Sequence, residues 1–171
     1  AGKTTLLNAI TGVHAADSGQ VLLDGSPFNA LLASDHSLVG SVPQDDVVHA
    51  ELTVEESLWY SARLRFPADA TRSTLNEEVD RVLRDLGIDH IRDSRIGNAL
   101  RRGISGGQRK RVNLGSELLT RSTRILFLDE PTSGLDPHTS EEIVSLLRQL
   151  ADSGRIVFIV THDVNPSVLR M

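Results

Sequence analysis

Two adjacent carboxylates, Asp129 and Glu130, follow an unbroken apolar run at residues 125–128. Such a run is typical of a parallel strand buried on both faces, and sheets of this kind bind ligands at the carboxyl ends of their strands. Asp129 is therefore a candidate ligand of Mg²⁺. Glu130 is a candidate base that orients or deprotonates a water attacking phosphorus. An acid pair that only caps a following helix is the alternative interpretation.

Gly2, Lys3 and Thr4 match the end of the phosphate-binding pattern G-x-x-x-x-G-K-[ST]. In that pattern, N–H groups at a helix start bind phosphate oxygens, the lysine binds the β- and γ-phosphates, and the hydroxyl ligates Mg²⁺. Three residues alone are equally consistent with an ordinary solvated lysine. Because the chain opens inside the pattern and without Met, we expect a fragment whose preceding residues supply the strand that leads into this loop.

A second anion-binding pattern, Ser-Gly-Gly-Gln at residues 105–108, precedes a helix predicted over residues 109–119. Glycines allow a backbone to approach an anion closely, and the following helix presents its positive dipole end there. One nucleotide needs one such cradle, so the second indicates a γ-phosphate presented by another subunit. A flexible turn is the alternative for this segment taken alone. The basic run at residues 109–111 is expected to form a solvated helix face.

The composition suits a single α/β domain with a substantial core. The 171 residues carry 18 Lys and Arg against 23 Asp and Glu, a formal net charge of −5, and 39% of them are hydrophobic. This charge argues against nucleic-acid binding driven by bulk electrostatics. The absence of cysteine excludes disulfides and thiolate metal sites. No apolar run approaches the ~20 residues that span a bilayer.

The elements that position these residues follow from apolar spacing and capping patterns. We predict a helix over residues 3–11, short strands over 20–24 and 38–42, and a parallel βαβ unit made of strands 125–128 and 156–160 and a helix beginning at Pro137. Thr53 and Glu56 form a capping-box pattern, which predicts a helix from Val54. Residues from about 45 to 104 show helical periods and no convincing strand.

The order and spacing of these patterns resemble the nucleotide-binding domain of ABC transporters. The matching motifs are the tail of Walker A (Gly2-Lys3-Thr4-Thr5), the Q-loop glutamine (Gln44) and the signature (Ser105-Gly106-Gly107-Gln108). They continue with Walker B (Asp129-Glu130), the D-loop (Ser133 to Asp136) and the switch histidine (His162). The resemblance spans the whole chain. Six motifs in sequence make a chance match negligible.

The resemblance implies an α/β P-loop NTPase fold: a RecA-like parallel sheet, a small antiparallel β part and a helical subdomain inserted at about residues 45–104. It also implies that two such domains enclose two ATP molecules head to tail. The implied nucleotide-binding residues are Gly2, Lys3, Thr4, Thr5, Gln44, Ser105, Gly106, Gly107, Gln108 and Asp136. The implied Mg²⁺ ligands are Thr4, Gln44 and Asp129, while Glu130 polarises water and His162 contacts the γ-phosphate.

Short sequence segments indicate one subfamily of the ABC transporters. The segments around Gln44 and Thr53, and residues 104–111, resemble the G subfamily, although Gln108 and Pro137 depart from its eukaryotic members. The departures suggest a bacterial-type member and put lipid or sterol export in doubt.

The family resemblance also implies partners and a location. The implied protein is an ATP hydrolase that powers transport at the cytoplasmic face of a membrane. Its partners would be a second nucleotide-binding domain, in a homo- or heterodimer, and transmembrane domains within the same polypeptide, with no nucleic acid. A soluble ABC ATPase, such as a translation factor of the ABC-F kind, is the alternative.

Overall fold

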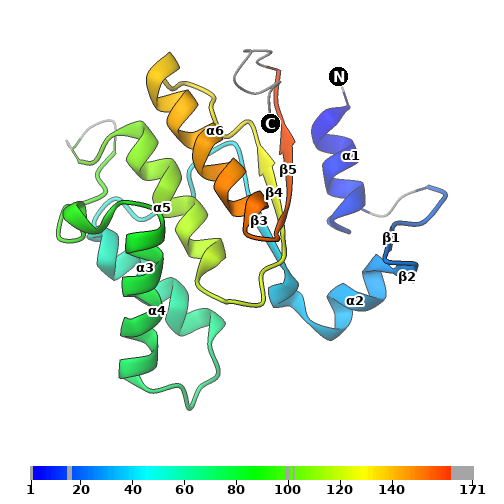
Figure 1. The fold of residues 1–171 in the computed structure, drawn as a ribbon, viewed down its shortest axis with the longest axis horizontal. Helices are drawn as coiled ribbons and strands as arrows, with labels where there is room; N and C mark the ends of the chain where they lie inside the picture. The colour runs from blue at the N-terminus through cyan, green and yellow to red at the C-terminus, as the bar shows by residue number, and fades with distance from the viewer. Residues whose placement is uncertain (1, 15–16, 99–100, 102, 163–171) are drawn as a thin grey trace.

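A three-stranded parallel sheet forms the centre of the computed structural model, which describes residues 2–14, 17–98, 101 and 103–162 (Figure 1). The strands are β3 (Val39–Val42), β4 (Ile125–Asp129) and β5 (Ile156–Val160), in the order β3-β4-β5. Val42 lies beside Leu128, and Asp129 lies beside Val160. The three strands therefore end at one edge of the sheet, where the residues that follow them converge.

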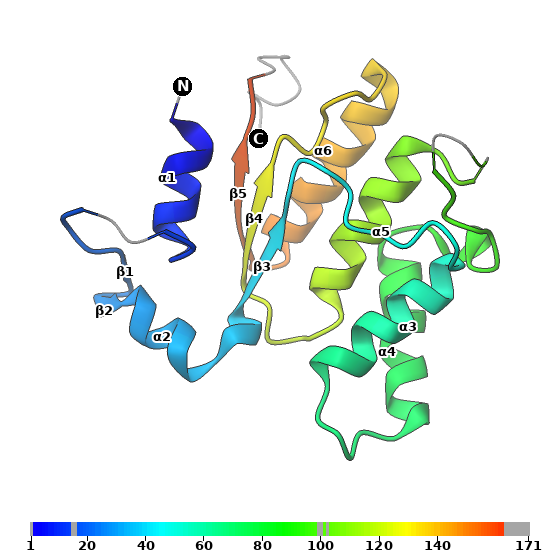
Figure 2. The same cartoon turned by 180° about the vertical axis from the view of Figure 1, so that it is seen from behind.

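Helices cover both faces of this sheet (Figures 1 and 2). One face packs on α1 (Lys3–Ile10) and α2 (Phe28–Ser34), and the other on α5 (Gly106–Leu118) and α6 (Pro137–Asp152), while α3 (Val54–Arg65) and α4 (Arg72–Asp85) pack against α5. Two short strands, β1 (Leu22–Leu23) and β2 (Ser26–Pro27), pair antiparallel, and single turns of 3₁₀ helix form η1 (His36–Leu38) and η2 (Asp89–Ile91). The predicted α/β class is confirmed.

Strand β4 is buried on both faces, as its apolar run predicted. Leu126 and Leu128 belong to a hydrophobic cluster with residues of α3 to α6. Ile125 and Phe127 belong to a second cluster, which contains residues of α1 and α2. Because successive side chains of a strand point to opposite faces, β4 joins the two layers of helices. Burial on both faces fixes its end, and hence the place of Asp129.

Strand β5 has the same apolar composition as β4 but a different environment. Ile156 is 43% exposed and Phe158 is 46% exposed, although the ring of Phe158 stacks on that of Phe127 with centroids 5.0 Å apart. Within the part of the chain that the structure describes, β5 pairs with β4 alone. The apolar run therefore predicted the strand correctly but does not indicate its degree of burial.

Between residues 45 and 104 the structure describes the helices α3 and α4 and the 3₁₀ turn η2, as the helical periods predicted. The capping box at the start of α3 is confirmed: Glu56 N–H donates to Thr53 Oγ1 at 3.1 Å, and Thr53 N–H donates to Glu56 Oε2 at 2.9 Å. Helix α4 is followed by Gly87 in the left-handed region, with φ of 64°. The only β contact among the described residues of this segment is an isolated bridge between Thr53 and Arg95.

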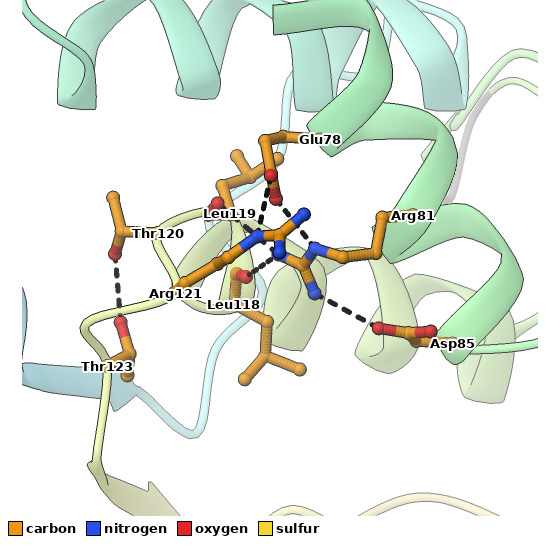
Figure 3. Close-up of polar contacts among 8 residues, drawn as sticks. All are labelled: Glu78, Arg81, Asp85, Leu118, Leu119, Thr120, Arg121 and Thr123. Carbon is orange, nitrogen blue, oxygen red and sulfur yellow. Dashed lines mark hydrogen bonds and ion pairs between the residues drawn. The ribbon is translucent and has the colours of Figure 1, made fainter. Parts of the chain in front are cut away.

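A group of charged side chains holds α4 against the end of α5 (Figure 3). Arg81 donates to Glu78 Oε2 at 2.6 Å and to the carbonyl oxygen of Leu118 at 2.7 Å. Arg121, in the loop before β4, donates to Glu78 Oε1 at 2.8 Å. We call Glu78, Arg81 and Arg121 the arginine cluster. It supplies a donor for a carbonyl group of the last helical turn, which lacks a partner within its own helix.

Helix α5 begins at Gly106, before the start that we predicted at residue 109. Ser105 is the N-cap, and its hydroxyl accepts from the N–H of Gln108 at 3.2 Å. This bond stabilises the first turn and extends the helix. Lys110 is only 7% exposed, so the predicted solvated face is wrong for this residue. Among the described residues, no helix has the length and apolar composition needed to cross a bilayer.

Candidate functional site

The first turn of α1 and the end of β4 meet through one hydrogen bond. Thr4 Oγ1 donates to Asp129 Oδ2 at 3.1 Å. Helix α1 starts after Gly2, whose φ of 91° is left-handed and free of strain only for glycine. Lys3 and Thr5 are exposed in the same turn. The structure thus joins two sequence patterns that lie 125 residues apart.

Glu130 and His162 form a second contact at the same edge of the sheet. His162 Nδ1 lies 2.7 Å from Glu130 Oε1. The two side chains are thus within hydrogen-bonding distance of each other. We call Thr4, Asp129, Glu130 and His162 the strand-end cluster. The cluster contains the residues that the sequence proposed for Mg²⁺ binding and for activation of water, except Gln44.

The backbone of Glu130 is bent into an unusual conformation. Its φ of 48° lies in the left-handed region, which residues other than glycine adopt rarely and at a cost of about 1–3 kcal/mol. The Glu130 N–H donates to the carbonyl oxygen of Val160 at 2.7 Å, which ties the bend to the end of β5. A hollow of about 330 Å³ adjoins this bend and is lined by Glu130, Thr132, Ser133, Gly134, Leu135, Thr161 and His162.

The oxygen atoms of Thr4 and Asp129 suit a hard divalent cation. In phosphate-binding sites Mg²⁺ takes one or two carboxylates together with phosphate oxygens. The Thr4 hydroxyl and the Asp129 carboxylate already lie 3.1 Å apart, on two elements that core packing holds in place. Gln44, the third expected ligand, is exposed just beyond the end of β3, at the edge where β4 also ends.

The signature residues lie on a separate element, at the start of α5. Ser105 and Gly106 are exposed, whereas Gly107 is buried. Gln108 completes a capping box, because its Oε1 accepts from the N–H of Ser105 at 2.9 Å. The sequence pattern Ser-x-x-Gln carries this signal, and our prediction overlooked it. Gln108 therefore has a structural role in addition to the nucleotide-binding role that the resemblance implies.

The two signature glycines pack against the D-loop and the helix after it. A Cβ atom on Gly107 would meet Thr139 Cγ2 at 2.2 Å, and one on Gly106 would meet Leu135 Cδ2 at 3.1 Å. Asp136 caps α6 by accepting from Thr139 Oγ1 at 2.6 Å and from Thr139 N–H at 3.1 Å. These hydrogen bonds lower the pKa of the Asp136 carboxyl. The small size of Gly107 is thus required for close packing of α5 on α6.

The sequence profile of the family described as "ABC transporter" matches residues 1–133. The chain belongs to the ABC transporter family. A second profile, described as an AAA domain, matches the shorter segment 107–168.

Individual relatives extend the match over the whole chain. ABC transporter G family member 28 of Arabidopsis thaliana is 45% identical to this chain, in an alignment that covers 100% of this chain and 15% of the plant protein. The ABC transporter ATP-binding/permease protein Rv1747 of Mycobacterium tuberculosis is 45% identical, with coverages of 96% and 18%. The broad substrate specificity transporter ABCG2 of Bos taurus is 39% identical, with coverages of 99% and 26%. The chain thus spans about a quarter or less of the lengths of these relatives.

A solved structure matches the fold as well as the sequence. CbiO1 from Clostridium perfringens, part of the ABC transporter complex cbiONQ, is 30% identical to this chain. The two structures superpose with a TM-score of 0.75 over 95% of this chain and 63% of the cbiO1 chain. Together the relatives show that the chain is a nucleotide-binding domain of the G subfamily, as the sequence around Gln44 predicted. A plant and a bacterial protein are both 45% identical, so the bacterial-type assignment stays a prediction.

Three residues beside the site were missed by the sequence reasoning. Lys110 Nζ donates to the carbonyl oxygen of Gln44 at 2.5 Å and lies 3.0 Å from Asp46 Oδ1. Asn113 Nδ2 donates to the same carboxylate oxygen at 2.8 Å. A signal for Lys110 existed, because it lies on the same helical stripe as Leu114 and Leu118, both buried. No sequence pattern indicated that Lys110 would contact Gln44 and Asp46, which lie 66 and 64 residues earlier in the chain.

Proposed function

We propose that this domain binds Mg-ATP at the strand-end cluster and hydrolyses it. The observation that supports the proposal is the hydrogen bond from Thr4 to Asp129, because it joins the helix start that carries the Gly-Lys-Thr pattern to a carboxylate at a strand end. Lys3 and the N–H groups of the first turn of α1 bind the phosphate oxygens. Thr4 and Asp129 would hold Mg²⁺, which would neutralise negative charge on the phosphates.

Glu130 acts as the base in the proposed reaction. It takes a proton from water as the water oxygen bonds to the γ-phosphorus and the bond to the β–γ bridging oxygen breaks, so that ADP leaves with that oxygen. Two features support this role: Glu130 follows Asp129 directly, and it lines the hollow at this edge of the sheet. His162, 2.7 Å from Glu130 Oε1, orients the carboxylate and contacts the γ-phosphate.

The signature completes the ATP site of a second copy. Ser105 and Gly106 are exposed at a helix start, a position that favours anions, and they lie on an element separate from Lys3 and Thr4. In the proposed head-to-tail dimer, Lys3, Thr4 and Gln44 of one copy face Ser105, Gly106 and Gly107 of the other. Closure on ATP and opening after hydrolysis then supply the motion that drives transport.

The names and lengths of the relatives support a transport role. The mycobacterial relative is an ATP-binding/permease protein, and the three relatives are several times longer than this chain. The proposed partners are therefore a second nucleotide-binding domain and transmembrane domains within the same polypeptide. In such an assembly the domain works at the cytoplasmic face of the membrane.

Mixed dimers test both the site and its action between copies. In the intact transporter, Ser105→Arg places a bulky side chain at the interface, and Lys3→Ala removes a phosphate contact. Each variant alone damages both composite sites. In a dimer of one copy of each, both lesions fall on the same site and the other site is whole. We therefore expect recovered ATP hydrolysis in the mixture, measured on mixed dimers purified through two different tags.

Two outcomes would contradict the proposal. Mixed dimers that form but recover no hydrolysis would exclude action of the signature on the other copy's nucleotide. Wild-type turnover by the Lys3→Ala homodimer would exclude ATP binding at the start of α1. Ser105→Arg should keep nearly normal ATP affinity in the monomer, because the start of α1 is unchanged.

A further inference from the structure

Lys110 is a buried cation in the first turns of α5. It is 7% exposed, and an ammonium group in such a place is costly unless it is paired and hydrogen-bonded. Its charge is balanced by Asp46, whose Oδ1 lies 3.0 Å from Nζ, and Nζ also donates to the carbonyl oxygen of Gln44 at 2.5 Å. Hydrogen bonds from a charged donor are among the stronger ones in proteins.

These contacts join two motifs that belong to different ATP sites in the proposed dimer. The Gln44 carbonyl lies just beyond the end of β3, on the residue whose side chain faces the domain's own nucleotide. Lys110 lies about one helical turn from Ser105, which faces the nucleotide of the other copy. Asn113, one turn further along α5, donates to Asp46 at 2.8 Å and gives the helix a second hold on the same loop.

The link resists separation of its two ends. A helical turn is stiff, so a shift of the Gln44 backbone carries the start of α5 with it or breaks the ammonium contact. Hydrogen bonds weaken steeply as distance and angle depart from their optimum. The capping box of Ser105 and Gln108 fixes the backbone of the first turn of α5, so that a displacement at Lys110 is passed on to Ser105.

We propose that Lys110 is a positioning residue that couples the two ATP sites through one chain. It holds Gln44 and the signature in a fixed relation, so that Gln44 in the domain's own site and the signature in the site of the other copy both depend on it. The inference rests on the proposed head-to-tail dimer. Lys110 itself touches neither nucleotide, and it acts through Gln44 on one side and through α5 on the other.

Lys110→Met tests the coupling in the intact transporter. The methionine fills a similar volume without charge, and Asp46 is not left buried and unpaired, because its side chain is 21% exposed and still accepts a hydrogen bond from Asn113. Arg111→Met is the matched control, because Arg111 is the next cation on α5 and contacts the Leu86 carbonyl oxygen and Glu142 rather than Gln44. Thermal unfolding midpoints of both variants should stay within a few degrees of wild type.

The mixed dimer of Ser105→Arg and Lys3→Ala provides the readout, because it has one working site. The Ser105→Arg copy supplies Gln44 to that site, and the Lys3→Ala copy supplies the signature. Lys110→Met is added first to one copy and then to the other. A coupling residue lowers the recovered hydrolysis in both placements, by about tenfold, the factor expected from loss of a hydrogen bond to a charged group. Arg111→Met should change it less than twofold in either placement.

The placements separate coupling from simpler roles. A fall only when Lys110→Met is in the copy that supplies Gln44 means that Lys110 merely holds the Q-loop, and a fall only in the other copy means that it merely holds the signature. Either result, or no fall at all, overturns the inference. Failure of the starting mixture to recover hydrolysis overturns the head-to-tail proposal itself, and the coupling with it.

A second variant guards against misfolding of Lys110→Met. Asp46→Asn keeps the shape of the side chain and removes the negative charge that balances the ammonium group. It should lower the recovered hydrolysis in both placements by a smaller factor than Lys110→Met. Equal activity with and without Asp46→Asn in both placements would overturn the coupling in the same way.

Discussion

The strand-end cluster lies where β4 and β5 end, and the arginine cluster lies where α5 ends and the loop to β4 begins. The two regions differ in how their polar groups find hydrogen-bond partners. At the strand ends, Glu130 adopts a left-handed backbone, and Ser105 and Gly106 are exposed at a helix start. In the arginine cluster, Glu78 is 8% exposed, and its carboxylate accepts from both Arg81 and Arg121 (Figure 3). The first region leaves hydrogen-bonding capacity for a ligand, whereas the second satisfies it internally.

This difference separates activity from stability. Backbone strain reduces stability and is common at functional sites, whereas exposed donors bind water until a ligand replaces it. A buried carboxylate with two guanidinium partners holds helices together but offers nothing to a ligand. Substitutions in the strand-end cluster should therefore change turnover at nearly constant stability, and substitutions in the arginine cluster should do the reverse.

The largest effect is expected for Glu130→Gln. The amide keeps the shape of the side chain but cannot accept the proton of the attacking water, so hydrolysis should fall about 10²- to 10⁴-fold. ATP binding should persist, and a closed dimer should accumulate, visible by size-exclusion chromatography with Mg-ATP. The unfolding midpoint should change little. Hydrolysis near the wild-type rate would show that Glu130 is not the base.

Arg81→Met should produce the largest loss of stability without loss of chemistry. It removes one guanidinium from the buried Glu78 and the donor from the carbonyl oxygen of Leu118, which should cost about 2–3 kcal/mol in the free energy of unfolding. Urea unfolding of the purified domain measures this change. Turnover per folded molecule should stay within about twofold, since the strand ends are untouched.

Arg84→Met is the matched control for Arg81→Met. Arg84 is an exposed arginine one turn further along α4. Its removal should change the free energy of unfolding by less than about 0.5 kcal/mol. Equal destabilisation by the two variants would show that the arginine cluster contributes no more than a surface charge.

The smallest effect concerns pH and two glutamates near the end of α5. Burial raises the pKa of Glu78, but hydrogen bonds and charges from Arg81 and Arg121 outweigh it and hold the pKa below the ordinary 4.5. Burial also raises the pKa of Glu117, and there Arg65 and the Ser41 N–H only partly offset it, so this pKa stays above its ordinary value. The two carboxyls therefore affect stability with opposite sign.

The sign of each effect follows from proton binding. The folded state binds a proton at Glu78 less readily than the unfolded state does, so its contribution is full above the ordinary pKa and is lost as the pH falls through the folded pKa. The folded state binds a proton at Glu117 more readily, so this carboxyl costs stability at neutral pH, and the cost is relieved on acidification.

Urea unfolding from roughly pH 7 down to pH 3 measures both effects. Glu78→Gln should remove part of the acid destabilisation and lower stability at neutral pH. Glu117→Gln should leave the stability at neutral pH unchanged or raise it by less than about 1 kcal/mol. A loss of stability in Glu117→Gln at neutral pH would show that its pairing with Arg65 outweighs the cost of burial.

Local signals in the sequence predicted most of the elements. The capping box of Thr53 and Glu56 fixed the start of α3, and the apolar run before Asp129 gave β4 with its burial. Both depend on residues close together in the chain, which is why pattern reasoning succeeds with them. The start of α5 was predicted too late only because the Ser105–Gln108 capping box was overlooked.

Contacts between distant segments were beyond the same reasoning. The motif order placed Thr4 and Asp129 in one site, but their hydrogen bond depends on how α1 packs against the sheet. No sequence motif predicts the contact of Lys110 with Gln44, because the long lysine side chain reaches from α5 to a loop. The same holds for the arginine cluster, in which the Arg81 side chain reaches from α4 to the end of α5. The exposure of Ile156 and Phe158 depends on which strands flank β5, which composition does not record.

The exposed side of β5 has a practical consequence for work with this chain in solution. Five consecutive apolar residues, without charge or proline, form a strand that the described residues pair along one edge only. An unpaired apolar edge can template pairing with the same strand of another molecule, which leads to aggregation that grows with concentration. Natural sheets oppose this with charged gatekeeper side chains beside their apolar strands, and Arg155, directly before β5, is the charged residue in that position here.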